Sequence, residues 1–452
     1  MEDKMRNIRS VWFLIILFLF IGFANSSFSQ DKKESPSIFI KTGKMWDSEE
    51  GNFAKNKIIK IDRNLISDVS EKMDIPKNGS VIDLSHYTVL PGLIDAHTHL
   101  LYLETLSNDP NNLTMQGMKA VIMEGDALRA LHGAARAKTF LEAGITAVQD
   151  VGNSGRFADI ALKIAIQDGS VIGPRMRVSG PGLCAVGGQF PRLLLEHQGI
   201  VNYEYRIVRG VEDGIQAVRE NLNMGADLIK VYSDSAPNRA YLSIEEMAAI
   251  VKEAHRYGLR VTTHAVNDTS VKNAVLAGVD GVDHVYHATD ETLKLIKEKG
   301  TFVIPTYTDR ESFIKFFTLS GRASQEQAEK AWEFSKKRFT DLIQRFRELG
   351  ITIVAGSDMY IDMKCPQGVA AKRVLYSYYE CGMPVKEILK TTSINAARHL
   401  GLENKIGVIK PKAYADIIAV NGDPEEDIHC LDKVVFVMKD GKVYVNKLSS
   451  QS

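Results

Sequence analysis

The chain has 452 residues, of which 44% are hydrophobic and 25% are charged, as in ordinary globular proteins. Its 56 basic and 56 acidic residues give a formal net charge of zero. This balance provides no electrostatic attraction for nucleic acid or an anionic membrane surface, so we expect neither as a partner.

The first element in the chain is an apolar run from Val11 to Ala24, which follows several basic residues. Small and polar residues come after it. This order is typical of a secretory signal peptide, which we place in residues 1–30. The run is shorter than the about 20 apolar residues that span a membrane. We therefore expect an exported protein, periplasmic or secreted, without stable membrane insertion after cleavage; an uncleaved N-terminal anchor is the alternative.

Two stretches near opposite ends of the chain have the character of β-strands. Residues 37–88 and 402–448 are rich in Ile, Val, Lys and Asp and have no helical period. The pair Asp440-Gly441 within the second stretch is a strong hairpin signal. We predict that both stretches build one small β-sandwich domain from the two ends of the chain.

Residues 89–401 between them repeat a single pattern. A helix-like stretch ends in a glycine, which accepts the left-handed conformation there, and an apolar strand-like run follows at once. Helices that alternate with short apolar strands predict a parallel sheet. The strand candidates are 89–97, 145–150, 175–180, 227–232, 259–264, 279–284, 301–306 and 351–357. Eight such units predict an α/β fold of the (β/α)₈ TIM-barrel type, with its active site at the carboxyl ends of the strands. A doubly wound open sheet is the alternative, but its site would draw on fewer strands.

Two histidines close the first of these strand candidates. His97 and His99 lie in Pro91-Gly-Leu-Ile-Asp-Ala-His-Thr-His. Because side chains alternate between the faces of a strand, the two imidazoles point the same way and can share a metal ion. A His-x-His pair alone is as often a surface or core feature, but its place at the end of an apolar strand favours the ligand role.

Further residues of ligand type end strands of their own, and they are Lys230, His264, His284 and Asp358. A protonated lysine cannot bind a metal. As a carbamate, however, Lys230 would supply two oxygens, enough to bridge two cations; an ion-paired lysine is the ordinary alternative. Asp358 could cap a helix. Beside a metal it would instead bind one ion and accept a proton from a bridging water. His287 is a further candidate, as a loop histidine near the substrate.

The donor set contains nitrogen and oxygen but no cysteine sulfur. It suits Zn²⁺, with manganese, cobalt or iron as alternatives. Two divalent ions about 3.5–4 Å apart polarise a carbonyl and lower the pKa of bound water to near 7. We therefore predict a site for two divalent metal ions, in which a metal-bridged hydroxide attacks an amide, ester or lactam.

These motifs resemble those of the amidohydrolase superfamily. The likeness runs from about residue 37 to 446, and its motifs are Pro91-Gly-Leu-Ile-Asp-Ala-His-Thr-His, Leu228-Ile-Lys-Val, Thr263-His-Ala, Asp283-His and Ala355-Gly-Ser-Asp. The chain is most like the imidazolonepropionase-like branch that contains Xaa-Pro and Xaa-Arg dipeptidases. The resemblance implies a dipeptidase or carboxypeptidase that cleaves a peptide-like C–N bond in a dipeptide or other small molecule.

The resemblance also implies a division of the metal ligands. The first ion would be held by His97, His99 and Asp358, and the second by His264 and His284. Lys230, carboxylated on Nζ by CO₂, would bridge the two ions.

Catalytic roles follow from the same resemblance. Asp358 would take the proton of the bridging hydroxide and pass it to the leaving amine. Tyr232, two residues past Lys230, would reach the substrate carbonyl or carboxylate, unless it packs in the barrel wall.

Two departures from the branch bear on substrate preference. Relatives often have His-Ala-His on the fifth strand, where this chain has His264-Ala-Val, and Gln189 stands in a loop where a histidine is expected. We expect the loops 181–206 and 308–330 to shape the pocket. Their arginines Arg192, Arg206 and Arg310 are candidates for binding a C-terminal carboxylate, although each is commonly a solvated surface charge.

Two other functions fit parts of the pattern. A mononuclear deaminase or cyclic amidohydrolase would use the same fold, but many such deaminases carry a glutamate shortly after the fifth-strand histidine, where this chain has Ala265-Val-Asn. A non-catalytic exported binding protein would not require Asp358 as a proton carrier. The sequence leaves oligomeric state open, a homo-oligomer included. Its four scattered cysteines predict no essential disulfide: Cys184, Cys365, Cys381 and Cys430.

Overall fold

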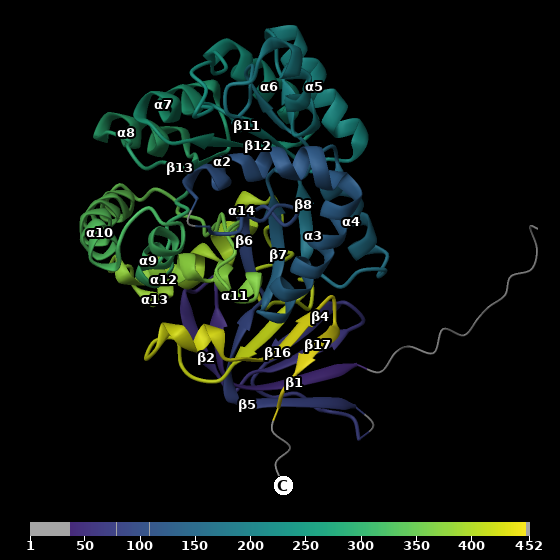
Figure 1. Cartoon of the computed structure of the whole chain (residues 1–452). Helices are drawn as coiled ribbons and strands as arrows, with labels where there is room; N and C mark the ends of the chain where they lie inside the picture. The colour runs from purple at the N-terminus through teal and green to yellow at the C-terminus, as the bar shows by residue number, and fades with distance from the viewer. Residues whose placement is uncertain (1–36, 78, 108, 449–452) are drawn as a thin grey trace, which may run out of the picture. The chain divides into compact units, whose positions relative to one another are not determined.

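The structure of the chain is a computed structural model, and it describes residues 37–448 except for residues 78 and 108 (Figure 1). The segment predicted as a signal peptide lies outside the described residues. Within them, no helix is both long enough and apolar enough to cross a bilayer.

The two ends of the chain build one small β domain, as predicted, and its strands form a single eight-stranded sheet instead of the two sheets of a sandwich (Figure 1). Its strands are β1 (Ile38–Asp47), β2 (Asn52–Lys55), β3 (Ile58–Asp62), β4 (Leu65–Ser70), β5 (Ser80–Pro91), β15 (Ile417–Val420), β16 (Val434–Lys439) and β17 (Lys442–Asn446). The two ends meet where β15 pairs antiparallel with β5, which also pairs parallel with β1. The β16–β17 turn has left-handed backbone at Asp440 (φ 51°) and Gly441 (φ 72°), which confirms the predicted hairpin.

This sheet curls back toward its own edge. The backbone N–H of Ile66 in β4 donates to the carbonyl of Ala413 at 2.9 Å, just before β15 begins. A core of fully buried side chains fills the interior, including Ile40, Leu84 and Phe436. Residues 37–448 form one compact unit in their contacts, so the domain boundaries at residues 89 and 402 stay predictions.

Seven of the eight predicted barrel strands are regular strands. They are β6 (Leu93–Thr98), β7 (Ile145–Asp150), β8 (Arg175–Val178), β11 (Leu228–Tyr232), β12 (Arg260–Ala265), β13 (Gly281–His284) and β14 (Phe302–Ile304). They pair in parallel as β6-β7-β8 and β11-β12-β13-β14. The eighth prediction, residues 351–357, is less regular: its one bridge joins Ile353 to Val303.

Backbone hydrogen bonds close the strands into a ring. The N–H of Asp227 donates to the carbonyl of Val178 at 2.8 Å and joins β8 to β11. Next to β6, the N–H of Ala96 donates to the carbonyl of Ala355, and the N–H of Asp358 donates to the carbonyl of His97, both at 2.9 Å. The segment 351–358 therefore lies between β14 and β6 and completes the (β/α)₈ arrangement.

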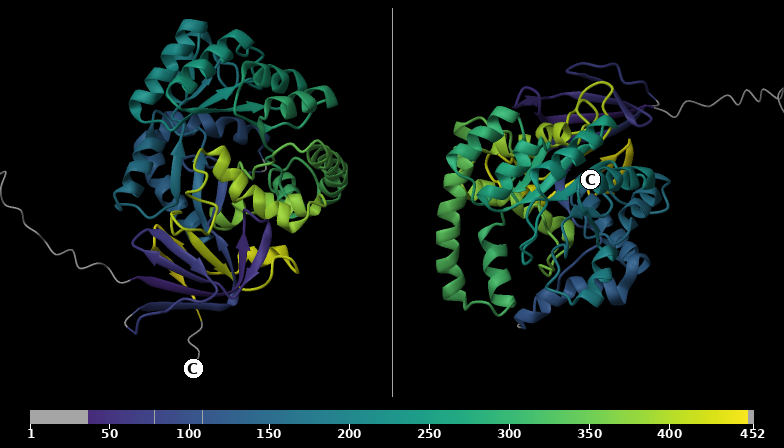
Figure 2. Two further views of the ribbon diagram at one scale, coloured as in Figure 1. Left: turned by 180° about the vertical axis from the view of Figure 1, so that it is seen from behind. Right: turned by 90° about the horizontal axis from the view of Figure 1, so that it is seen from above.

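Helices lie around the barrel strands (Figures 1 and 2). They are α2 (Pro110–Lys119), a π-helix (Ala120–Glu124), α3 (Gly125–Glu142), α4 (Ala158–Gln167), α5 (Val211–Met224), α6 (Ile244–Arg256), α7 (Asp268–Ala277), α8 (Asp290–Lys299), α9 (Arg310–Leu319), α10 (Gln325–Glu348), α11 (Gln367–Ala371), α12 (Arg373–Glu380), α13 (Val385–Thr391) and α14 (Ile394–His399). Two 3₁₀ helices (Leu195–Tyr203 and Ile428–Asp432) and the short strands β9 (Gly182–Cys184) and β10 (Tyr205–Ile207) complete the described chain. As the sequence predicts, left-handed glycines end α5 and α7, at Gly225 and Gly278. All four cysteines carry free thiols.

Candidate metal centre and its cavity

The predicted ligands gather around one cavity of about 530 Å³, a size that suits a small-molecule ligand. Its wall includes every one of the six proposed metal ligands: His97, His99, Lys230, His264, His284 and Asp358. Lys230 lies at the centre of β11, and the other side chains lie near or just past the carboxyl ends of barrel strands. The barrel thus brings together residues from five different strand positions, which the sequence separates by up to 261 residues (Asp358 minus His97).

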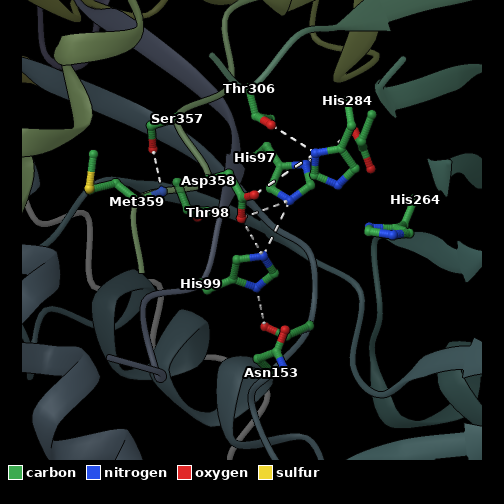
Figure 3. A network of polar contacts seen from close by, with 12 residues as sticks. His97, Thr98, His99, Asn153, His264, His284, Thr306, Ser357, Asp358 and Met359 are labelled. Carbon is green, nitrogen blue, oxygen red and sulfur yellow. Dashed lines mark hydrogen bonds and ion pairs between the residues drawn. The ribbon is translucent and has the colours of Figure 1, made fainter. Parts of the chain in front are cut away.

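Three of these side chains form the tightest group (Figure 3). The Nε2 atoms of His97 and His99 lie 3.2 Å apart. Asp358 Oδ1 lies 3.2 Å from the Nε2 of His99 and 3.5 Å from that of His97. Their ligand atoms all lie within 4.8 Å of one another, as a shared cation requires.

The hydrogen bonding of His99 indicates why a cation fits here. Its Nδ1 lies 2.8 Å from the carbonyl oxygen of Gly152, which can only accept, so Nδ1 carries a proton. In a neutral His99 the lone pair is then on Nε2, which faces a carboxylate oxygen of Asp358. Two acceptors face each other unless positive charge lies between them. A proton on His99 or a divalent ion both satisfy this arrangement, and the nitrogen and oxygen donors suit zinc.

The remaining histidines extend the site toward β12 and β13. The rings of His264 and His284 have centroids 4.5 Å apart, and those of His97 and His284 are 5.3 Å apart. His284 Nδ1 lies 2.7 Å from the hydroxyl of Thr306 and 3.9 Å from Asp358 Oδ2. In Figure 3, His264 stands apart from the tight group, on the far side of His284.

His264 is held by a carboxylate that sequence reasoning missed. Asp234 Oδ1 lies 3.1 Å from His264 Nε2, while Oδ2 accepts from the N–H of Val266 at 2.8 Å and the hydroxyl of Ser270 at 2.6 Å. Burial alone would raise the pKa of Asp234, but the contact with His264 and these donors hold it well below its usual range. A carboxylate beside a histidine fixes the orientation of the imidazole ring.

The charge of Lys230 is compensated by a neighbouring carboxylate. Its ammonium group forms a fully buried ion pair with Asp283, which precedes His284 in β13. Asp283 Oδ1 also lies 3.2 Å from His97 Nδ1 and from the hydroxyl of Thr262. Burial would raise the pKa of Asp283, but Lys230 and His97 hold it far below its ordinary value. Asp283 therefore links two predicted metal ligands.

The pKa shifts of His97, His284 and Asp358 favour metal binding, whereas for His99 burial is outweighed by the contact with Asp358, which raises the pKa of that imidazole. Burial lowers the pKa of His97 and, together with the neighbouring His264, lowers that of His284 well below its ordinary value. Burial opposes ionisation of Asp358, but His97 and His99 keep its pKa below the usual range. Neutral imidazoles and an ionised carboxylate are the forms that bind divalent ions.

Backbone strain also concentrates at these strand ends. His284 (φ 74°), Val285 (φ 53°) and Asp358 (φ 50°) all adopt left-handed conformations, although none is a glycine. Such residues cost about 1–3 kcal/mol each and cluster at functional sites.

Two of the three residues predicted to bind substrate line the cavity, and one does not. Gln189 and Tyr232 line the cavity, and the Gln189 amide nitrogen lies 3.3 Å from His264 Nε2. Tyr232 is 2% exposed and also packs in the wall, with its ring centroid 5.5 Å from that of His264. His287 is exposed and is not part of the cavity wall. Left-handed backbone at His284 and Val285 turns the chain there, so strand alternation does not carry on to residue 287.

The arginines proposed for carboxylate binding also lie elsewhere. None of Arg192, Arg206 and Arg310 lines the cavity. Arg206 is ion-paired with Asp213 and Glu220 at 2.7 Å, and Arg310 with Glu329 at 3.2 Å. The wall instead contains Glu104 and Arg322, which no motif in the sequence singled out.

Comparisons with known proteins agree with this geometry. Residues 88–444 match the model of the amidohydrolase family. The chain is 27% identical over 426 residues to ochratoxinase from Aspergillus niger, covering 87% of this chain and 84% of that protein. It is 25% identical over 362 residues to imidazolonepropionase from Symbiobacterium thermophilum, covering 75% of this chain and 76% of the other.

A solved structure of a Xaa-Pro dipeptidase with methionine bound in its active site has the same fold. It superposes with a TM-score of 0.77 at 28% identity, over 91% of this chain and 100% of the dipeptidase. The family, the relatives and the fold therefore all point to hydrolysis of carbon–nitrogen bonds.

Proposed function

Because this chain belongs to the amidohydrolase family, we propose that it hydrolyses the amide bond of dipeptides or related small peptide-like compounds. That it is a hydrolase acting on carbon–nitrogen bonds follows from the family and from its similarity to ochratoxinase and a Xaa-Pro dipeptidase. The observation that carries the narrower proposal is the convergence of His97, His99 and Asp358 in a cavity of about 530 Å³, which fits a dipeptide.

The proposed centre holds two divalent ions, with zinc as the expected metal. His97, His99 and Asp358 would hold the first, and His264 and His284 the second. In its unmodified form Lys230 is an ammonium group paired with Asp283 and cannot be a ligand. Carboxylation of its Nζ would supply the two oxygens that a bridge between the ions needs, which is why we propose that modification.

Bound divalent cations supply a Lewis acid for the scissile carbonyl and acidify water to near neutral pH. The protein's own contribution begins with Asp358. Its Oδ1 faces His97 and His99, whereas its Oδ2 lies 3.9 Å from His284 Nδ1, and we assign the proton transfer to Oδ2. Because its pKa is held low, Asp358 is ionised at neutral pH and can accept that proton, then donate it to the leaving amine nitrogen.

The cavity wall orients the substrate for this transfer. Tyr232 and Gln189 flank His264, and we assign them to the substrate carbonyl side. The proposed substrate is a small molecule, since the cavity is bounded by loops from both halves of the barrel. We also propose that the protein is exported, on the basis of the basic and apolar pattern of residues 1–30.

The experiment is hydrolysis of a defined library of Ala–Xaa dipeptides and N-acyl amino acids by protein reconstituted with zinc in bicarbonate. Products are read by mass spectrometry, and metal content by elemental analysis. We expect cleavage at the amide bond and two ions per chain. One ion per chain after full reconstitution, with turnover of lactams or release of ammonia only, would favour a mononuclear cyclic amidohydrolase or deaminase.

Lys230→Ala tests the bridge separately. We expect loss of turnover by about 100-fold or more, together with loss of one bound ion. A variant that kept two tightly bound ions and normal turnover would contradict the bridging role. Arg310→Ala, a paired surface residue outside the cavity, is the matched control and should behave as wild type.

A further inference from the structure

Arg322 is a basic residue of the cavity wall without a carboxylate partner. The lysine and arginine side chains that line the cavity, among the described residues, are Lys230 and Arg322. Lys230 is paired with the buried Asp283. Among the described residues no carboxylate forms an ion pair with Arg322, whose guanidinium stacks instead on the ring of Phe316, 4.9 Å from its centroid. A guanidinium held over a ring keeps its donors available to a ligand.

The position of Arg322 places it at the exposed side of the cavity. It lies in the turn between α9 and α10, which run side by side as a helical hairpin (Figures 1 and 2). Its backbone N–H donates to the carbonyl of Phe317 at 3.0 Å, so the turn is fixed at the end of α9. The residue is exposed and yet belongs to the wall, as expected for a group at the entrance.

Glu104 lies near the same part of the wall. It accepts a hydrogen bond from the hydroxyl of Tyr102 at 2.6 Å. Burial raises the pKa of Glu104, and the positive charge of Arg322 acts in the opposite direction. The positive charge of Arg322 therefore acts on Glu104, although the two side chains form no ion pair. A ligand that enters the cavity meets an available cation with an acidic group beside it.

We propose that Arg322 binds the free carboxylate of the amino acid that leaves when the substrate amide is cleaved. A planar guanidinium donates two parallel hydrogen bonds to a carboxylate, and this match gives both affinity and orientation. The proposal rests on the proposed function, since it names the part of the substrate that the cavity recognises. It also replaces Arg192, Arg206 and Arg310, which lie outside the wall.

The test compares each Ala–Xaa dipeptide with its C-terminal amide, in the wild type and in Arg322→Ala. In the wild type the amide raises KM by about 10- to 100-fold, the range of a charge-assisted hydrogen-bonded pair. Arg322→Ala raises KM for the free acid by a similar factor, changes kcat little, and leaves the amide unaffected. Arg322→Lys has an intermediate KM for the free acid, because it keeps the positive charge but loses the two parallel donors of the guanidinium. Arg310→Ala, on the same helical hairpin, is the matched control and matches the wild type.

Two outcomes overturn the proposal. One is that the wild type cleaves the free-acid and amide dipeptides equally well. The other is that Arg322→Ala loses activity toward the acids and the amides by the same factor. If the wild type cleaves no member of the series, the proposed function fails, and ligand binding then tests the carboxylate site independently of activity. N-acetyl-L-leucine and its amide are then titrated calorimetrically into metal-loaded wild type and Arg322→Ala. Tighter binding of the acid in the wild type alone supports the carboxylate site; equal binding of acid and amide rejects it.

Discussion

The buried ion pair between Arg129 and Glu204 gives the sharpest stability prediction. Arg129 in α3 is 1% exposed, and Glu204, just before β10, is 3% exposed. Two hydrogen bonds join them, from Arg129 Nη1 to Oε2 at 2.6 Å and from Nη2 to Oε1 at 3.1 Å. Arg129 also donates to the carbonyl of Asn153, a residue of the cavity wall. The pair therefore fixes the loop that follows β7 against α3.

Arg129→Met keeps the unbranched stem but leaves the Glu204 carboxylate buried without a partner. Removing one partner of such a pair costs about 3–5 kcal/mol of unfolding free energy. The double variant Arg129→Met/Glu204→Gln removes both charges, so it should recover about 2 kcal/mol of that loss. Arg136→Met is the matched control on the same helix. Arg136 Nε donates to the carbonyl of Leu100, and among the described residues no carboxylate forms an ion pair with Arg136, so we expect a loss of about 1 kcal/mol.

The assay is equilibrium urea unfolding followed by tryptophan fluorescence, with free energies from linear extrapolation. A loss below about 1 kcal/mol in Arg129→Met would refute the reasoning, because the orphaned charge would then be solvated or neutralised without cost. A double variant as unstable as the single one would also refute it, since the charge of Glu204 would not be the cause.

Two further predictions concern regions away from the metal centre. Burial, aided by the charge of Asp150, raises the pKa of Asp159 to about 7 in the folded protein, above its unfolded value of 3.8. The stability that Asp159 contributes is thus complete below about pH 4 and is lost as the pH rises toward 7. The loss of unfolding free energy between pH 5 and pH 8 is about 2–3 kcal/mol. Asp159→Asn should flatten this part of the pH profile of urea unfolding, whereas a profile parallel to that of the wild type would show that the carboxyl is not protonated in the fold. Gly441→Ala should destabilise the folded protein by about 2 kcal/mol or more, because φ is 72° there and a Cβ would lie 2.0 Å from the carbonyl oxygen of Arg63. Thermal unfolding measures this loss. An unchanged melting temperature would mean that the hairpin can shift to make room.

Strand alternation and strand ends made much of the site predictable. His97 and His99 share a face because they are two residues apart, and the structure places their Nε2 atoms 3.2 Å apart. Lys230, His264 and His284 lie in neighbouring parallel strands, so the barrel brings them together whatever the sequence of the helices between them. Local periodicity was enough for these residues because each position is fixed by its own strand.

The misplaced and missed residues lie where the chain leaves a strand. His287 follows two left-handed residues, after which alternation no longer sets direction. The segment 351–357 is only partly regular: a Cβ on Gly356 would lie 2.7 Å from the Cβ of His97, so the backbone passes close against β6. Asp234 lies beyond the end of β11, in a segment whose path depends on contacts that sequence patterns do not record.

The sequence by itself determined the fold class, and it predicted the six candidate ligands with their nitrogen and oxygen donors. These depend on hydrophobic period and residue type, which are local properties. Only the tertiary structure decided that Asp283 pairs with Lys230, that Glu104 and Arg322 enter the cavity wall, and that Arg206 and Arg310 are engaged elsewhere. The reason is physical: a charged side chain takes its partner from whatever segment packs beside it, and that neighbour is set by the closure of the barrel and the packing of its helices.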